Sequence, residues 1–167
     1  ATLGRLQERL GISEEALVRR VESLVEETKE LQQRVKLLSG QLARLAADEL
    51  AAGPQELGGV RAAVGHFPHF TVDELRLIAD RLRELWPPPF AGVLTGAGAG
   101  DRLRYVVFVS PDLRERLPAG SLAKAVGAAL GGGGGGRPDI AEGGGLVSRL
   151  AEGQAAFRQA LAGIAAQ

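Results

Sequence analysis

The sequence predicts an α/β or α+β protein, in which a long helical segment over residues 1–53 precedes a compact domain over residues 54–167. Three observations lead to this prediction. A heptad repeat of apolar residues runs through the first third of the chain, Gly53 and Pro54 end it, and helix-like and strand-like segments follow. We expect the compact domain to hold a central β-sheet with flanking helices.

The composition fits a folded domain with a helical appendage. The chain has 167 residues, of which 45% are hydrophobic and 24% charged. Its 20 basic and 20 acidic residues cancel, so a long-range positive field cannot recruit a polyanion. Any contact with nucleic acid must therefore be local. Basic residues slightly outnumber acidic ones only after residue 56, which favours the second part of the chain for that contact.

Several classes of protein are disfavoured. The chain has no cysteine, which removes disulfides, thiolate nucleophiles and the common structural zinc sites. It contains no apolar run of about 20 residues and does not open on a charged-then-apolar leader. We therefore expect a cytoplasmic protein with no membrane partner. The lack of methionine, even at the first position, indicates a piece of a longer protein.

The heptad repeat predicts self-association as a homodimer. Steps of four and three alternate without a break, and β-branched residues at one core position with leucine at the other favour a two-stranded coiled coil. Ser13 starts the helix, and Gly40 is a possible local break. The alternative is an amphipathic helix lying on its own domain. The predicted dimerisation residues are Leu17, Val21, Leu24, Leu31, Val35, Leu38, Leu42 and Leu45, with Thr28 in the same repeat.

The compact domain begins with a short strand over Val60 to Val64. Thr71 and Glu74 then have the spacing of a capping box, which predicts a helix running to about Trp86, where three prolines stop it. Two buried strands follow, over Gly92 to Thr95 and Leu103 to Val109, joined by a glycine-rich hairpin loop.

Two further helices complete the predicted domain. Ser121 is the expected cap of a helix that carries Leu122 and Val126 and ends at the glycine run. The last helix follows the glycine run, and its apolar face is formed by Leu150, Phe157, Leu161 and Ile164.

The segment from Gly131 to Gly145 reads GGGGGGRPDIAEGGG. Composition alone suggests a flexible linker, but the run lies between two helices of one domain and carries specific residues at its centre. Glycines allow close backbone approach, and successive amides bind anions. Lys124 and Arg137 flank the run, where they could neutralise a phosphate or stack on a base. Neither a Walker loop nor a dinucleotide motif is present, so we expect no nucleotide cofactor.

This glycine segment resembles the signature of the DHHA1 domain, in the version found at the C-terminus of bacterial alanyl-tRNA synthetases. The resemblance lies in the polyglycine, then Arg137, Pro138, Asp139, Ile140, Ala141, Glu142 and glycine again. It implies a DHHA1-like domain that has no cofactor, dimerises through its helices and binds the tRNA elbow, helping to coordinate aminoacylation and editing. The ligase that contains such a domain consumes ATP and alanine at sites outside this segment. The residues expected to contact tRNA are Gly133, Gly134, Gly135, Gly136, Arg137 and Lys124, with Arg102 and Arg104 as further candidates.

Other functions stay open at this point. The same fold occurs in DHH-family phosphoesterases, where this module is the substrate-binding half, but no histidine follows Gly136 here. A module for dimerisation or for binding single-stranded DNA is a further alternative. Arg137 contacts tRNA or pairs internally with Asp139 or Glu142. Asp139 is expected to be a turn residue.

We expect no metal site and no catalytic residue. His66 and His69 lack an obvious third ligand, so we interpret them as loop residues packed by Phe67 and Phe70. Trp86 is interpreted as a core residue. The sequence offers no clear Ser/His/Asp set, paired-carboxylate cleft or activated nucleophile.

Overall fold

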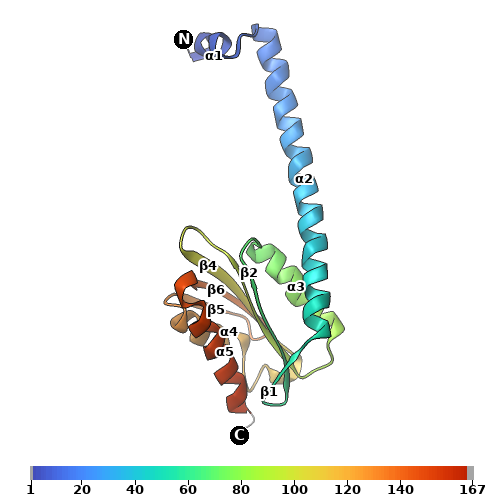
Figure 1. Ribbon diagram of the computed structural model, residues 1–167, viewed down its shortest axis with the longest axis vertical. Coiled ribbons are helices and arrows are strands. Elements are labelled where there is room, and N and C mark those ends of the chain that lie inside the picture. Colours follow the sequence, from blue (N-terminus) through green and yellow to red (C-terminus); the bar gives the residue numbers. More distant parts are fainter. Residues whose placement is uncertain (1, 165–167) are drawn as a thin grey trace. The chain divides into compact units, whose positions relative to one another are not determined.

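The computed structural model describes residues 2–164, and the chain forms two compact units that meet at Ser39 and Gly40. Helices α1 (Thr2–Leu10) and α2 (Glu14–Ala52) are drawn in blue and cyan in Figure 1. Helix α2 begins in the first unit and ends in the second. The second unit starts earlier than the predicted boundary at residues 53 and 54, because Ala43 and Ala47 are fully buried in its core.

Helix α2 is continuous, and the possible break at Gly40 does not occur. Its start agrees with the sequence, because the Ser13 hydroxyl accepts a hydrogen bond from the amide of Ala16 at 3.3 Å. Leu17 is buried, whereas the later leucine and valine positions of the heptad repeat expose between 44% and 65% of their surface. In the second unit, Ala43 and Ala47 face the core, while Leu42 and Leu45 remain exposed. The heptad repeat is therefore not used for packing within that unit.

The second unit is built on one six-stranded mixed sheet with the order β1-β2-β3-β4-β6-β5. Only β2 and β3 are parallel among these pairs, and every other neighbouring pair is antiparallel. The short edge strand β1 was not predicted from the sequence. The strands are β1 (Gln55–Leu57), β2 (Val60–Phe67), β3 (Phe90–Ala97), β4 (Arg102–Val109), β5 (Gly133–Gly136) and β6 (Ile140–Leu146).

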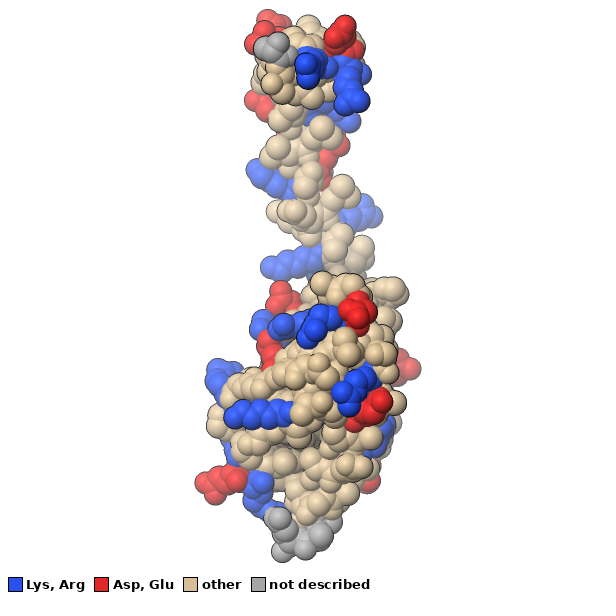
Figure 2. All heavy atoms as spheres, turned by 90° about the vertical axis from the view of Figure 1, so that its left-hand side faces the viewer, with Lys and Arg blue, Asp and Glu red and all other residues tan. Residues whose placement is uncertain are grey.

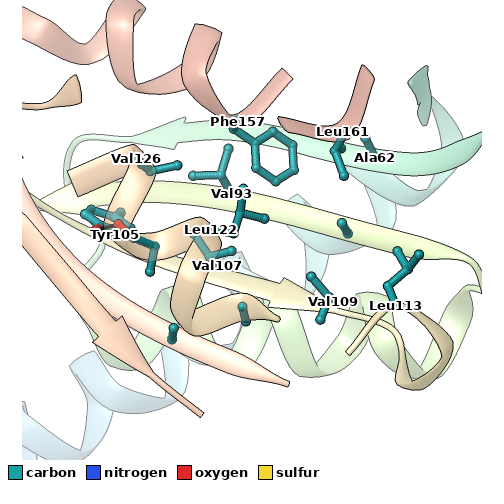
Figure 3. Packing of buried hydrophobic residues seen from close by; sticks show 14 of the residues in the cluster. Ala62, Val93, Tyr105, Val107, Val109, Leu113, Leu122, Val126, Phe157 and Leu161 are labelled. Carbon is teal, nitrogen blue, oxygen red and sulfur yellow. Dashed lines mark hydrogen bonds between the residues drawn. The ribbon is translucent and has the colours of Figure 1, made fainter. Parts of the chain in front are cut away.

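Helices cover both faces of the sheet. Helix α3 (Val72–Leu85) and the end of α2 pack on one face, and α4 (Ala119–Ala129) and α5 (Leu150–Ile164) pack on the other (Figure 1). Two short 3-10 helices, Pro111–Leu113 and Val147–Arg149, join these elements. In β4 the side chains alternate between two apolar cores, so the strand contributes to both. Figure 3 shows the core beneath α4 and α5, where Phe157 and Leu161 lie over the sheet.

The α+β class and most predicted elements are confirmed. The capping box ahead of α3 forms, since the Glu74 carboxylate accepts a hydrogen bond from the Thr71 amide at 2.5 Å. Trp86 is a core residue, with 6% of its surface exposed. Helix α4 begins at Ala119 with Pro118 at its cap, so the prediction of Ser121 as the cap is wrong. Ser121 lies in the first turn, where its amide bonds to the Pro118 carbonyl.

Candidate nucleic-acid interface

The glycine run folds into two paired strands at the edge of the sheet. We call β5, β6 and the turn between them the glycine hairpin. Its antiparallel register pairs Gly133 with Gly144 and Gly135 with Glu142. The sequence predicts a glycine segment between two helices and no strands within it, whereas the hairpin supplies one third of the strands in the sheet. The hairpin structure also excludes the flexible-linker interpretation.

Several glycines are required because helix α4 and Tyr105 approach the hairpin closely. A Cβ atom at Gly134 would lie 2.0 Å from the Tyr105 hydroxyl, and one at Gly143 would lie 2.3 Å from it. On the helix side, a Cβ atom at Gly127 would lie 2.7 Å from the backbone of Gly133. These distances are too short for any side chain, so the glycines allow α4 to pack directly on the hairpin backbone.

The Tyr105 hydroxyl fixes α4 and the hairpin to the same point. It donates a hydrogen bond to the Ala123 carbonyl at 2.6 Å and also lies 3.3 Å from the Gly133 carbonyl. The side chain is fully buried. Burial raises the pKa of Tyr105 to about 12, because the phenolate would lose its hydration. The hydroxyl therefore remains a hydrogen-bond donor at neutral pH.

Two glycines of β5 face open space. A Cβ atom at Gly133 or Gly135 would meet no atom within 4 Å. Neither residue has a backbone conformation restricted to glycine, since the glycine with positive φ in β5 is Gly136. Packing within the described chain therefore gives no reason for glycine at these two positions. A surface without side chains leaves room for a ligand to approach the β5 backbone.

Strand register shows which predicted contact residues lie together. Arg104 is opposite Gly144, which is opposite Gly133, so these three residues lie on one face of the sheet. This is the face that α3 covers. Val106 of β4 points to the same face as Arg104, and it is buried in the apolar core between the sheet and α3. Arg102 also lies on this face. Arg102, Arg104, Gly133 and Gly135 therefore share one side.

The other predicted residues lie elsewhere on the hairpin edge. Gly134 and Gly136 alternate with the open glycines and face the opposite side. Lys124 is an exposed residue of α4, four positions after Gly120, whose Cβ would lie 2.7 Å from the Gly136 carbonyl. Lys124 therefore lies on the helical stripe beside β5. The predicted residues surround the edge of the sheet rather than forming one flat surface.

Arg137 forms an internal ion pair and is also exposed. Its Nε atom lies 3.4 Å from the Asp139 carboxylate, although 74% of its side chain is accessible. Burial acts to raise the pKa of Asp139, but its own backbone amide and Arg137, Arg83 and Arg114 outweigh that effect and lower the pKa. Asp139 therefore stays ionised at neutral pH. Of the two internal partners expected for Arg137, the structure places Asp139 beside it.

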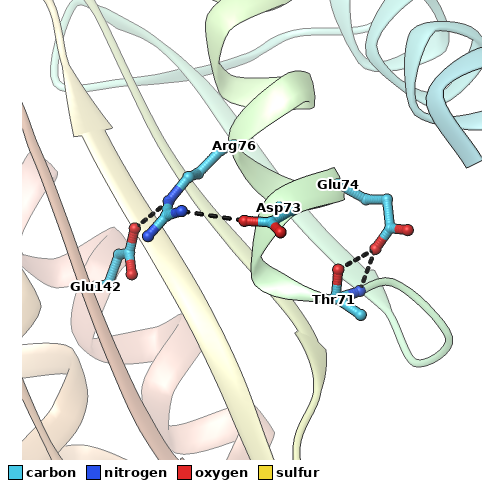
Figure 4. Close-up of polar contacts among 5 residues, drawn as sticks. All are labelled: Thr71, Asp73, Glu74, Arg76 and Glu142. Carbon is cyan, nitrogen blue, oxygen red and sulfur yellow. Dashed lines mark hydrogen bonds and ion pairs between the residues drawn. The ribbon is translucent and has the colours of Figure 1, made fainter. Parts of the chain in front are cut away.

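The other expected partner, Glu142, pairs with Arg76 of α3. Figure 4 shows the Arg76 guanidinium between Glu142 and Asp73, with Nε toward Glu142 and Nη1 3.1 Å from Asp73. Arg83, two turns further along α3, lies 3.4 Å from Asp139. Sequence reasoning missed Arg76 and Arg83 as site residues. The two arginines are seven residues apart, which places them on one side of the helix. This spacing is the only feature of the sequence that indicates a shared basic surface on α3.

A cleft of about 550 Å³ lies between α3 and the glycine hairpin. We call it the α3 cleft. Its walls contain three arginines and two acidic residues among the described residues, so its charge is mixed. Mixed charge is also evident on the face displayed in Figure 2, where basic and acidic side chains are interspersed. The lining residues are Arg76, Asp80, Arg83, Gly135, Gly136, Arg137, Ile140, Ala141 and Glu142.

Residues 2–164 contain no cluster of three or more His, Cys, Asp or Glu side chains suited to a metal ion. His66 instead contacts the Thr95 hydroxyl through Nδ1 at 2.8 Å. Thr95 donates its own proton to the Gly65 carbonyl at 3.2 Å, so His66 acts as the donor in the first contact. None of the described helices has the length and apolarity required to cross a bilayer.

These features define a six-stranded α+β domain with helices on both faces and a glycine hairpin at one edge. The chain belongs to the DHHA1 domain family, whose model matches residues 59–163. The Arg-Pro-Asp segment (residues 137–139) and both strands of the glycine hairpin lie within that range.

Comparisons with known proteins specify the form of the domain. The chain is 32% identical over 141 residues to an alanine–tRNA ligase of Solibacter usitatus and 35% identical over 147 residues to one of Hydrogenovibrio crunogenus. These matches cover 84% and 87% of the chain but only 16% and 17% of the two relatives. The chain is also similar to the C-Ala domain of Aquifex aeolicus alanyl-tRNA synthetase. That match has a TM-score of 0.60 and 29% identity, and covers 65% of this chain and 97% of the other.

Proposed function

We propose that this chain is a non-catalytic C-terminal module of a cytoplasmic alanine–tRNA ligase, which binds the tRNA elbow and dimerises through its helices. The relatives supply the proposed substrate, because they are named as alanine–tRNA ligases. The module would bind tRNA without forming or breaking a bond, while the ligase reaction takes place at sites outside it.

The observation that carries the proposal is the open backbone of the glycine hairpin beside an exposed arginine. Gly133 and Gly135 present peptide groups without side chains, and Arg137 extends from the end of β5. Backbone amides and a guanidinium group suit phosphate oxygens, and a guanidinium plane also stacks on a base. The site therefore has the chemistry of a local RNA contact.

The zero net charge of the chain is more compatible with binding to the tRNA elbow than with binding along an RNA duplex. A protein that binds along a duplex depends on many phosphate contacts and a basic surface. The tRNA elbow offers loop bases and closely spaced phosphates, which are recognised by shape, stacking and backbone contacts. A module joined to the rest of the ligase needs only weak affinity, because the linkage raises its effective concentration near bound tRNA.

The heptad repeat supports the dimerisation part of the proposal. The leucine and valine positions from Val21 to Leu45 expose at least 44% of their surface. An unbroken apolar stripe of this length on a single helix is typical of a coiled-coil interface. A second copy of the chain would bury this stripe. The repeat does not specify whether the two helices run parallel or antiparallel.

The proposal is tested by titrating the chain against alanine tRNA, a second tRNA and single-stranded DNA, each at several salt concentrations. We expect both tRNAs to bind more tightly than DNA, because the elbow is common to tRNAs. Combined Arg137→Ala and Lys124→Ala substitutions should weaken tRNA binding about tenfold and reduce its salt dependence.

Arg158→Ala is the matched control. Arg158 lies 3.5 Å from Gln55 of β1, at the sheet edge opposite the glycine hairpin. This variant should bind tRNA like the unmodified chain. Absence of tRNA binding at low salt would overturn the proposed function. Equal binding by the Arg137/Lys124 variant and the control would place the contact elsewhere, and preference for DNA would favour the single-stranded DNA alternative.

A further inference from the structure

Helix α3 contributes arginines to the cleft at the glycine hairpin. Arg76 and Arg83 lie on the α3 wall, and Arg137 lies on the hairpin wall. The cleft volume of about 550 Å³ falls within the range of roughly 300–1,000 Å³ that is usual for ligand pockets. Gly135 and Gly136 form part of its lining, so a ligand there would reach the β5 backbone as well as the arginines.

The Asp139 carboxylate connects the two walls. One carboxylate oxygen lies 3.4 Å from Arg83 Nη2, and the other lies 3.4 Å from Arg137 Nε. The side chain of Asp139 is 20% exposed, so these contacts are partly shielded from water. One acidic group thereby orients two guanidinium groups from different elements, and Arg83 lies 56 residues before Asp139 along the chain.

Glu142 orients the third arginine. Arg76 uses Nε toward Glu142 and Nη1 toward Asp73, and no contact among the described residues engages its Nη2. Arg137 likewise uses only Nε, which leaves Nη1 and Nη2 available within the described part of the chain. Arg76 and Arg137 are therefore held in place while retaining unused N–H donors. Arg83 pairs through Nη1 with Asp80 at 3.6 Å as well as through Nη2 with Asp139. Fixed guanidinium donors are well suited to phosphate, whose geometry they match.

We propose that the α3 cleft binds a backbone phosphate of the tRNA through Arg76, Arg83 and Arg137, with Asp139 and Glu142 as positioning residues. The inference rests on the proposed function and extends the contact surface to helix α3. The carboxylates neutralise much of the arginine charge, so the cleft selects a phosphate at short range and adds little long-range attraction.

The test compares tRNA binding by the full chain with that of Arg83→Gln and Arg76→Gln variants. We expect each substitution to weaken binding about five- to tenfold and to reduce the slope of log affinity against log salt by about one. Arg83→Lys keeps the charge but loses the fork of donors, so it should bind with intermediate affinity. Melting temperatures establish that each variant is folded.

Arg81→Gln is the matched control, because Arg81 is on the same helix and is also paired with acidic residues. Its partners are Asp48 of α2 and Glu84, and it does not line the cleft. If the unmodified chain binds tRNA and the Arg83, Arg76 and Arg81 variants bind equally well, the cleft proposal is wrong while the proposed function stands. If the unmodified chain binds no tRNA, both fail.

The positioning role of Asp139 can be tested separately, because a positioning role and simple charge repulsion predict opposite changes in tRNA affinity for Asp139→Asn. A carboxylate that only repels RNA would, on conversion to Asn, give tighter binding. A carboxylate that orients two arginines would give weaker binding, although the protein has lost a negative charge. We expect Asp139→Asn to weaken tRNA binding several-fold, and tighter binding would overturn the positioning role.

Discussion

A Cβ atom added at Gly134 would lie 2.0 Å from the hydroxyl oxygen of Tyr105, a distance at which no two such atoms coexist. The neighbouring Gly135 has no atom within 4 Å of the same added position. Two adjacent residues of the same strand are therefore both glycine, but the surroundings exclude a side chain at only one of them. At Gly134 the constraint is internal packing, and at Gly135 the described chain supplies none.

This difference predicts different stabilities for two alanine variants. Gly134→Ala must displace Tyr105 or the hairpin, so it should lower the free energy of unfolding by about 1–3 kcal/mol. Gly135→Ala should leave stability unchanged or raise it slightly, because alanine reduces the freedom of the unfolded chain. Urea denaturation of both variants checks this. Equal destabilisation of the two would contradict the observed packing of β5.

Tyr105→Phe should cost about 1 kcal/mol of stability at neutral pH, because the Ala123 carbonyl loses a buried donor. The pH dependence follows from a folded-state pKa of about 12, above the ordinary value of 10.0. The folded chain holds the phenolic proton more tightly, so this stabilisation is complete below pH 10.0 and declines as the pH rises toward 12. Denaturation midpoints across this range should fall more for the unmodified chain than for Tyr105→Phe.

Asp139→Asn should reduce stability at pH 7, where the carboxylate pairs with Arg83 and Arg137. Because folding lowers the pKa of Asp139 below 3.8, its contribution is present above that pH. It is lost as the pH falls through the lower folded-state pKa. The difference between the variant and the unmodified chain should therefore shrink in acid. A difference that stays constant from pH 7 to pH 3 would show that charge is not its cause.

Leu31→Lys tests the proposed dimer interface. Leu31 is 63% exposed in the single chain and lies in the middle of the heptad repeat. A lysine there would be buried in the interface without a partner, so it should convert a dimer into a monomer at micromolar concentration. Gln33→Lys, an exposed position on the same helix outside the repeat, should remain dimeric. Sedimentation velocity distinguishes these states, and a monomeric unmodified chain would refute the dimer.

Features set by neighbouring residues could be predicted from the sequence. Helix α3 is an example, because Thr71 and Glu74 make a local capping interaction and the apolar spacing identifies its buried face. The strands of the glycine hairpin could not be predicted in this way. Glycine has low β-propensity, and the strand conformation depends on pairing with β4 and on packing against Tyr105 and α4.

The same distinction applies to the candidate site. Arg137 could be selected because it directly follows the polyglycine. Arg76 and Arg83 could not be linked to it, since their hairpin partners lie 66 and 56 residues away along the chain. The compact unit starts at Gly40, ahead of the boundary expected at residues 53 and 54, for a related reason. Ala43 and Ala47 are buried by the folded domain, and nothing in the heptad repeat distinguishes them from exposed alanines.

Trp86 gives this chain an intrinsic optical reporter. It is the only tryptophan, it is buried beside Phe90, and its indole N–H donates to the Ala51 carbonyl near the end of α2 at 3.4 Å. Its emission should shift to longer wavelength when the end of α2 separates from α3 and water reaches the ring. Fluorescence would thus follow the attachment of the long helix to the domain without an added dye, while leaving the glycine hairpin chemically unaltered.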